Sequence, residues 1–227
     1  MALTAPGDAC QVPLMPLSWI PNALTIARCG FAVLLLYATA KAGTVADAAL
    51  ATSSAEDFAR LARLEQLWRQ FALLAFVAGA FTDFGDGFLA RRLNAQSRFG
   101  VWLDPIADKL LVGAALISLC IAIGGWLIIL PAAAIIMRDV GMTIFRATPQ
   151  GRSAVDVSGL AKWKTAVEMI AITGLLLPQA LAPMTREPSG AADGPGLVVY
   201  GFAALLWVAA ALSILTAASY VRASRRS

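Results

Sequence analysis

The chain has 227 residues, of which 59% are hydrophobic and only 14% charged, and its formal net charge is +4. Soluble domains usually carry about 45–50% apolar and about 25% charged residues, so this composition excludes an ordinary soluble globule, which needs a polar coat. The sequence contains no histidine; this excludes histidine-based catalysis and leaves oxygen ligands, which suit magnesium, calcium or manganese, for any metal ion.

The cysteines and the basic residues exclude further classes. Three widely spaced cysteines provide neither a disulfide framework nor a zinc site. The basic residues are dispersed and lack interleaved aromatic residues, so the sequence does not predict a nucleic-acid surface. The first twelve residues lack the features of a cleaved signal peptide, and we therefore expect the first apolar run to be retained as a membrane span.

Long apolar segments recur along the whole chain. A membrane helix needs about 20 mainly apolar residues, and six segments approach this length. We predict an all-α, polytopic membrane protein with a single domain over residues 1–227 and six transmembrane helices. The predicted spans are Ile20–Ala40, Phe71–Ala90, Val101–Ile123, Trp126–Phe145, Leu160–Leu181 and Leu197–Tyr220.

The connection between the first two spans, residues 41–70, is unusually long. Residues 55–70 combine helical spacing with mixed charge. We predict that they form an amphipathic helix lying at the outer membrane surface, with a plain loop as the alternative. The second outer connection, residues 178–196, is rich in proline and glycine and is expected to be irregular.

Lysine and arginine predict the orientation. Most of them fall at the ends of the predicted spans that share a side with the N-terminus. Because cytoplasmic loops carry an excess of basic residues, both termini are expected on the cytoplasmic side of an inner (cytoplasmic) membrane.

Four aspartates lie in the segment DFGDGFLARRLNAQSRFGVWLDPIADK. Asp83 and Asp86 are three residues apart and Asp104 and Asp108 are four apart, so each pair shares one helix face. A short polar link makes the two helices antiparallel neighbours, and the pairs can face each other. Four carboxylates in a partly apolar site repel one another unless a counter-charge is present. Two divalent cations, Mg²⁺ or Mn²⁺, would supply it and could hold a pyrophosphate. The alternative is that these are helix-end charges paired with nearby arginine and lysine.

Small residues and an arginine accompany the aspartates. Gly87 costs about 1 kcal/mol relative to alanine inside a helix, which indicates close approach of a ligand or a neighbouring helix. Ala90 places another small side chain on the same helix face. Arg91 can bind phosphate oxygens with two hydrogen bonds. Gly100 clears space one turn before Asp104.

The spacing D-x2-D-G-x2-A-R-x8-G-x3-D-x3-D is identified as the signature of the CDP-alcohol phosphatidyltransferase family. It is matched at Asp83, Asp86, Gly87, Ala90, Arg91, Gly100, Asp104 and Asp108. The resemblance implies six membrane helices, a homodimer, and release of CMP from a CDP-activated lipid such as CDP-diacylglycerol. It also implies that the four aspartates bind metal, and that Asp108 is in addition the general base.

The resemblance extends to the site for CDP-lipid, which would be lined by Gly87, Ala90, Arg91 and Gly100. The segment IPNALTIAR (Ile20–Arg28) resembles the start of bacterial phosphatidylglycerophosphate synthases, a branch of this family. The resemblance places Asn22 and Arg28 toward the active site. Asn22 could instead be a simple helix N-cap.

Two further segments bear on the acceptor alcohol. Two segments resemble segments of the same synthases: RDVGMTIFR, from Arg138 to Arg146, and LAKWKTAVEM, from Leu160. Their departures are Asp139, Phe145 and Glu168. The five cations of this region form a predicted inner-face patch, consisting of Arg138, Arg146, Arg152, Lys162 and Lys164. A phosphorylated acceptor needs such a patch, and we expect glycerol 3-phosphate.

Three alternatives to this interpretation of the cations and of the function remain open. Arg152, Lys162 and Lys164 could simply follow the positive-inside pattern. The chain could be a CMP-releasing cardiolipin synthase that uses phosphatidylglycerol, because that branch carries an RDV triplet like the one at Arg138. A non-enzymatic membrane cation-binding protein is a remote alternative, since Arg91 would repel cations.

Overall fold

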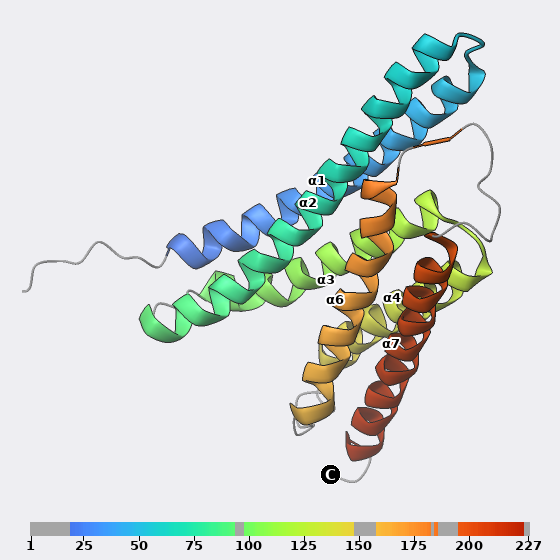
Figure 1. The fold of residues 1–227 in the computed structure, drawn as a ribbon. Coiled ribbons are helices and arrows are strands. Elements are labelled where there is room, and N and C mark those ends of the chain that lie inside the picture. Colours follow the sequence, from blue (N-terminus) through green and yellow to red (C-terminus); the bar gives the residue numbers. More distant parts are fainter. Residues whose placement is uncertain (1–18, 94–97, 148–157, 183, 186–194, 225–227) are drawn as a thin grey trace, which may run out of the picture.

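The computed structural model describes residues 19–93, 98–147, 158–182, 184–185 and 195–224. Within these ranges the regular structure is entirely α-helical, which confirms the predicted class. Figure 1 shows the helices as long rods that cross at differing angles. They are α1 (Trp19–Ala51), α2 (Ala55–Leu93), α3 (Arg98–Ala122), α4 (Trp126–Ala147), α6 (Ser158–Leu181) and α7 (Pro195–Ser224).

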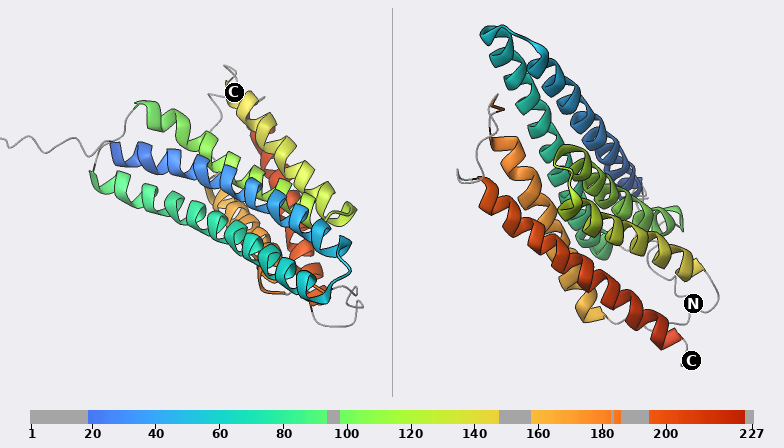
Figure 2. Two further views of the ribbon diagram at one scale, coloured as in Figure 1. Left: turned by 90° about the horizontal axis from the view of Figure 1, so that it is seen from above. Right: turned by 90° about the vertical axis from the view of Figure 1, so that its right-hand side faces the viewer.

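Helices α1 and α2 form a long antiparallel hairpin, which corrects the prediction for residues 41–70. α1 continues to Ala51 and α2 begins at Ala55, so residues 55–70 are the first part of α2 and not a separate surface helix. The two helices lie side by side in every view, and the tip of the hairpin extends past the ends of the other helices (Figures 1 and 2). The Ser54 hydroxyl caps α2 by accepting a hydrogen bond from the Asp57 amide at 3.3 Å.

Polar side chains in the first part of α2 contact the end of α6. Gln66 and Gln70 donate hydrogen bonds to the last carbonyls of α6, those of Leu181 (3.2 Å) and Ala180 (3.3 Å). These carbonyls have no partner within their own helix. Arg69 pairs with the buried Glu65 on its own helix. The charged and amide groups therefore bind neighbouring helix ends and one another, and the helix stays in the bundle.

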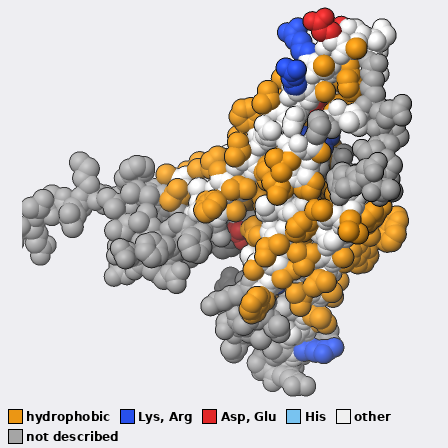
Figure 3. Space-filling model, in the orientation of Figure 1, with side chains coloured by type: hydrophobic (Ala, Val, Ile, Leu, Met, Phe, Trp, Pro, Cys, Tyr) orange, Lys and Arg blue, Asp and Glu red, His pale blue; other side chains and the backbone are white. Residues whose placement is uncertain are grey.

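The described part of the chain contains three helices that are long and apolar enough to cross a membrane. They are Ala23–Ala51, Trp126–Phe145 and Gly196–Tyr220. Large apolar side chains cover much of the surface in Figure 3, whereas charged side chains gather at the hairpin tip. Trp163 and Leu197, for example, are 72% and 84% exposed. An apolar exterior of this extent requires a lipid environment, and the chain is a membrane protein.

Glycines allow two close helix contacts. A Cβ atom on Gly79 of α2 would lie only 2.7 Å from the Leu111 Cδ2 atom of α3. A Cβ atom on Gly174 of α6 would overlap the Phe202 ring of α7. Small residues at such crossings let membrane helices approach closely. The contact at Gly79 holds α2 against α3 one turn before the first aspartate of the motif.

Candidate active site

The four aspartates lie on the two neighbouring helices α2 and α3. Asp83 and Asp86 are in the last three turns of α2, and Asp104 and Asp108 are in the first three turns of α3. Leu111, which packs against Gly79, follows Asp108 by one turn. The two halves of the motif therefore lie at similar positions along the axes of the neighbouring helices α2 and α3, as the spacing predicts.

Among these aspartates, the structure describes the side chain of Asp108, which is half-buried. Several other predicted site residues have side chains outside the described part of the structure: Asn22, Asp83, Asp86, Gly87, Ala90, Arg91, Gly100, Asp104, Arg146 and Lys162. Arg152 lies wholly outside the described residues. The roles assigned to these positions stay predictions. Among the described side chains, no three carboxylates or cysteines come together as a metal site.

The donor chemistry of the motif nevertheless fits hard divalent cations. All four candidate ligands are carboxylates, and the chain has no histidine that could replace them. Such oxygen donors suit Mg²⁺ and Mn²⁺. Asp83 and Asp86 share one face of α2 because they are three residues apart, and Asp104 and Asp108 are one turn apart on α3.

Arg28 of α1 is deeply buried, with only 1% of its surface exposed, beside the fully buried Thr25. It lies one turn before Ala32 on the face of α1 that packs into the core. A buried guanidinium is costly unless it is paired, and ionisable groups at membrane depth usually serve a function. Arg28 therefore lies buried on the core face of α1, and its place at the active site stays a prediction.

Arg138 and Lys164, from the predicted cation patch, meet at a single carboxylate. The Asp139 Oδ1 atom accepts hydrogen bonds from Arg138 Nη1 at 2.8 Å and from Lys164 Nζ at 3.1 Å. Lys164 Nζ also lies 3.4 Å from Glu168 Oε2. We call these four residues the ion-pair cluster. Lys164 and Glu168 are only 6% and 3% exposed, so solvent screens the cluster little.

The cluster also reaches α7. Arg138 Nε donates to the Ser213 carbonyl at 3.0 Å, and Arg138 Nη2 donates to the Thr216 hydroxyl at 3.0 Å. Arg138 thus connects α4 to α7, and Asp139 connects α4 to α6. The predicted cation patch includes both residues but not their carboxylate partners. The available signals were the adjacency of Arg138 and Asp139 and the four-residue spacing of Lys164 and Glu168.

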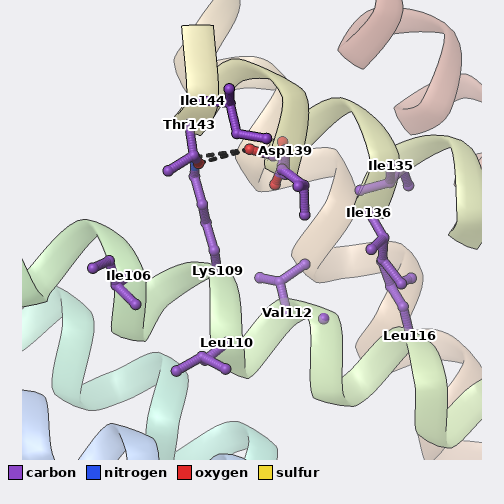
Figure 4. A pocket seen from close by; sticks show the side chains of 12 residues that line it. Ile106, Lys109, Leu110, Val112, Leu116, Ile135, Ile136, Asp139, Thr143 and Ile144 are labelled. Atoms are coloured by element: carbon purple, nitrogen blue, oxygen red, sulfur yellow. Dashed lines mark hydrogen bonds between the residues drawn. The ribbon is translucent and has the colours of Figure 1, made fainter. Parts of the chain in front are cut away.

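Lys109, next to Asp108, connects α3 to α4. Its ammonium group donates to the Asp139 carbonyl at 3.1 Å and to the Thr143 hydroxyl. Figure 4 shows the lysine side chain rising from α3 to meet these two residues of α4. The carboxylate motif and the ion-pair cluster are therefore linked through two adjacent residues of α3, Asp108 and Lys109.

These features define a helical membrane protein with paired aspartates on neighbouring helices and a buried charged cluster beside them. The family model for CDP-alcohol phosphatidyltransferase matches residues 18–217. The chain belongs to the CDP-alcohol phosphatidyltransferase family, which confirms the resemblance found in the motif.

Several relatives carry names that describe a reaction. The CDP-diacylglycerol–glycerol-3-phosphate 3-phosphatidyltransferase of Escherichia coli K12 is 37% identical over 162 residues, which cover 70% of this chain and 81% of that protein. The Arabidopsis thaliana CDP-diacylglycerol–glycerol-3-phosphate 3-phosphatidyltransferase 2 is 40% identical over 65% of this chain and 64% of its own length. A CMP-forming cardiolipin synthase of Oryza sativa subsp. japonica is 39% identical over 65% of this chain. The chain spans only 46% of that rice protein and less than two thirds of the Arabidopsis protein.

Proposed function

We propose that this protein transfers the phosphatidyl group of CDP-diacylglycerol to glycerol 3-phosphate, giving phosphatidylglycerophosphate and CMP. The observation that carries the proposal is the complete aspartate motif on α2 and α3. The names of the Escherichia coli and Arabidopsis relatives support the choice of acceptor. Phosphatidylglycerol is the second candidate acceptor, because the rice relative has nearly the same identity and is named as a cardiolipin synthase.

Asp83, Asp86, Asp104 and Asp108 would hold the divalent cations, two Mg²⁺ or Mn²⁺ ions. When bound, the cations neutralise negative charge on the pyrophosphate. In the proposed reaction Asp108 accepts the proton of the acceptor hydroxyl. The acceptor oxygen forms a bond to the phosphorus that carries the lipid, and the phosphorus–oxygen bond to CMP breaks. CMP leaves with the electron pair, and Gly87, Ala90, Arg91, Gly100 and Asn22 would line its site.

The acceptor phosphate would bind near Arg138 and Lys164. Asp139 gathers these two cations at one point. However, Asp139 and Glu168 balance both positive charges within the cluster. A phosphate dianion would therefore need additional cations, and Arg146, Arg152 and Lys162 are the candidates that the sequence offers nearby. Arginine suits phosphate binding because its planar guanidinium group can donate two parallel hydrogen bonds to phosphate oxygens.

We also propose that α2, α3 and α6 cross the membrane together with α1, α4 and α7, giving six spans in an inner (cytoplasmic) membrane. Both termini and the aspartate motif would face the cytoplasm, where the basic residues concentrate. A Ser53→Cys variant at the hairpin tip should react with an impermeant thiol reagent from outside, and an Asn94→Cys variant should not. The opposite labelling pattern would invert the topology. A homodimer is proposed from the family resemblance.

The test of function supplies one acceptor at a time to the purified protein in CDP-diacylglycerol micelles. Glycerol 3-phosphate should release CMP, whereas inositol phosphate and serine should not. Asp83→Asn should abolish release, and the matched control Asp47→Asn, an exposed carboxylate of α1, should not. Release with phosphatidylglycerol alone would identify a cardiolipin synthase. Divalent-cation binding without CMP release from any acceptor would favour the non-enzymatic alternative.

A further inference from the structure

Lys109 joins the start of α3 to α4, and no step of the proposed reaction uses it. Its ammonium group donates hydrogen bonds to the Asp139 carbonyl at 3.1 Å and to the Thr143 hydroxyl. The Thr143 hydroxyl donates to the same carbonyl at 2.7 Å, and Figure 4 shows these groups meeting on α4. We call this contact the Lys109 tether. Because Lys109 directly follows Asp108, the tether holds α3 at the level of the candidate site.

Asp108 and Lys109 are directed to different neighbours of α3. Asp108 shares a helix face with Leu111, three residues later, and Leu111 packs against α2 at Gly79. Successive residues of a helix are turned by about 100° about its axis, which brings Lys109 to the side of α4. The contacts of Leu111 and Lys109 together therefore define how α3 is rotated, and with it the direction of the Asp108 side chain.

Side-chain packing does not fix this rotation on the side of α4. A groove of about 280 Å³ lies between α3 and α4 and is lined in part by Lys109. Gly113 lies one turn after Lys109 on the same face, and a Cβ atom added there would meet nothing within 4 Å. Leu110, which also lines the groove, is 50% exposed. The described side chains therefore leave room for α3 to turn toward α4, and the hydrogen bonds of Lys109 restrain that motion.

We propose that Lys109 is a positioning residue: the Lys109 tether sets the rotation of α3 that directs Asp108 toward α2. This inference rests on the proposed function, in which Asp108 acts together with the aspartates of α2. Side-chain tips lie about 5–6 Å from a helix axis, so a turn of about 15° moves a carboxylate by roughly 1.5 Å. A misplacement of about 1 Å can cost about 100-fold in rate. A small rotation of α3 is therefore enough to impair the reaction.

Two variants break the Lys109 tether in different ways. Lys109→Met removes the charge and both hydrogen bonds, and we expect kcat for CMP release to fall about 10- to 100-fold. Thr143→Val keeps the charge and removes one partner, and kcat should fall about threefold, the scale of one interhelical hydrogen bond. The KM for CDP-diacylglycerol should change little in either variant. Lys109→Arg, which keeps a cation with several donors, should restore most of the rate.

Thr173→Val is the matched control for Thr143→Val. The Thr173 hydroxyl donates to the Met169 carbonyl at 2.8 Å, which is the same bond to the carbonyl four residues earlier that Thr143 makes. This control should leave kcat unchanged. An equal loss in both threonine variants would overturn the proposal, because the loss would then come from the helix itself.

The double variant Lys109→Met with Thr143→Val separates a tether from a direct effect of the lysine charge. If Thr143 acts by holding Lys109, the double variant should be no slower than Lys109→Met alone. Losses that multiply in the double variant would overturn the proposal. Full activity of Thr143→Val would also overturn it, because the charge of Lys109 alone would then be what matters.

A second measurement needs no substrate. Mn²⁺ is titrated into the purified protein, and the free ion is followed by its electron paramagnetic resonance signal. Residues that orient metal ligands typically contribute about 10–100-fold to metal affinity, so Lys109→Met should weaken Mn²⁺ binding about tenfold. Thr173→Val should not change it. Melting temperatures in detergent identify a variant that has unfolded, and if Lys109→Met does so, Thr143→Val decides.

Failure of the Lys109 tether is distinguishable from failure of the proposed function. If the wild type binds Mn²⁺ but releases no CMP with any acceptor, the proposed function is overturned, and unchanged Mn²⁺ affinity in Lys109→Met then overturns the tether as well. If the wild type releases CMP while Lys109→Met and Thr143→Val keep its kcat and its Mn²⁺ affinity, the tether alone is overturned.

Discussion

Replacing Arg138 by alanine tests whether this arginine holds the helices together or is free for substrate. The substitution removes hydrogen bonds to Asp139 Oδ1 (2.8 Å), to the Ser213 carbonyl (3.0 Å) and to the Thr216 hydroxyl (3.0 Å). Two of the three join different helices. Lys164 remains beside Asp139, so the carboxylate does not lose all of its compensating charge.

The expected cost lies between two limits. Interhelical hydrogen bonds in a membrane protein average about 0.6 kcal/mol each and reach about 1.7 kcal/mol, so the two bonds to α7 set a lower limit of about 1 kcal/mol. Breaking a buried ion pair by removing one partner costs about 3–5 kcal/mol, and the Arg138 side chain is only 16% exposed. The remaining partner of Asp139 reduces this figure. We therefore expect Arg138→Ala to lower the free energy of unfolding by about 2–4 kcal/mol.

The measurement is thermal unfolding in a fixed detergent, where this loss corresponds to a fall in melting temperature of roughly 10 °C. Arg60→Ala, which removes an exposed arginine near the hairpin tip, is the matched control and should change stability by less than about 0.5 kcal/mol. Thr216→Val should fall in between. If Arg138→Ala melts at the same temperature as Arg60→Ala while the KM for glycerol 3-phosphate rises tenfold, the ion-pair cluster does not hold the helices together. Arg138 would then serve the substrate alone.

Three further outcomes are expected. Excess chelator should abolish CMP release, and Mg²⁺ or Mn²⁺ should restore it, because oxygen donors alone form the motif; full activity in chelator would exclude the metal. Asp108→Asn keeps the size of the side chain but cannot accept a proton, so the rate of CMP release should fall by about 10²–10⁴-fold. If the variant keeps more than roughly a tenth of the wild-type rate, Asp108 is not the general base. Gly174→Leu should lower the melting temperature, because a Cβ atom added at this position overlaps the Phe202 ring. Gly201→Leu should lower it less, because the space around residue 201 is open. Equal melting temperatures for both variants would contradict the close packing of α6 on α7.

The helix positions in the second half of the chain could be predicted closely from the sequence. The helix predicted over Trp126–Phe145 agrees in position with α4, which ends at Ala147, and the helix predicted over Leu160–Leu181 agrees in position with α6, which begins at Ser158. Long apolar runs bounded by polar segments leave few alternatives, because every backbone amide in lipid must be bonded within its own helix. The helix predicted over residues 55–70 is confirmed, but its separation from the following span is wrong, because Ala55–Leu93 is one continuous helix.

By itself, the sequence determined the fold class and the chemistry of the motif. The apolar composition specifies a helical membrane protein, and four aspartates at helical spacing in a chain without histidine predict an oxygen-ligand site, since both rest on residue type and local periodicity. Only the tertiary structure decided which charges meet. Arg138, Asp139, Lys164 and Glu168 come from two helices and bind a third through Ser213 and Thr216, and local spacing carries no information on how separate helices are rotated against each other. The same holds for the apolar groove of about 280 Å³ between α3 and α4, because its walls come from two separate helices that are joined through Lys109 and Thr143.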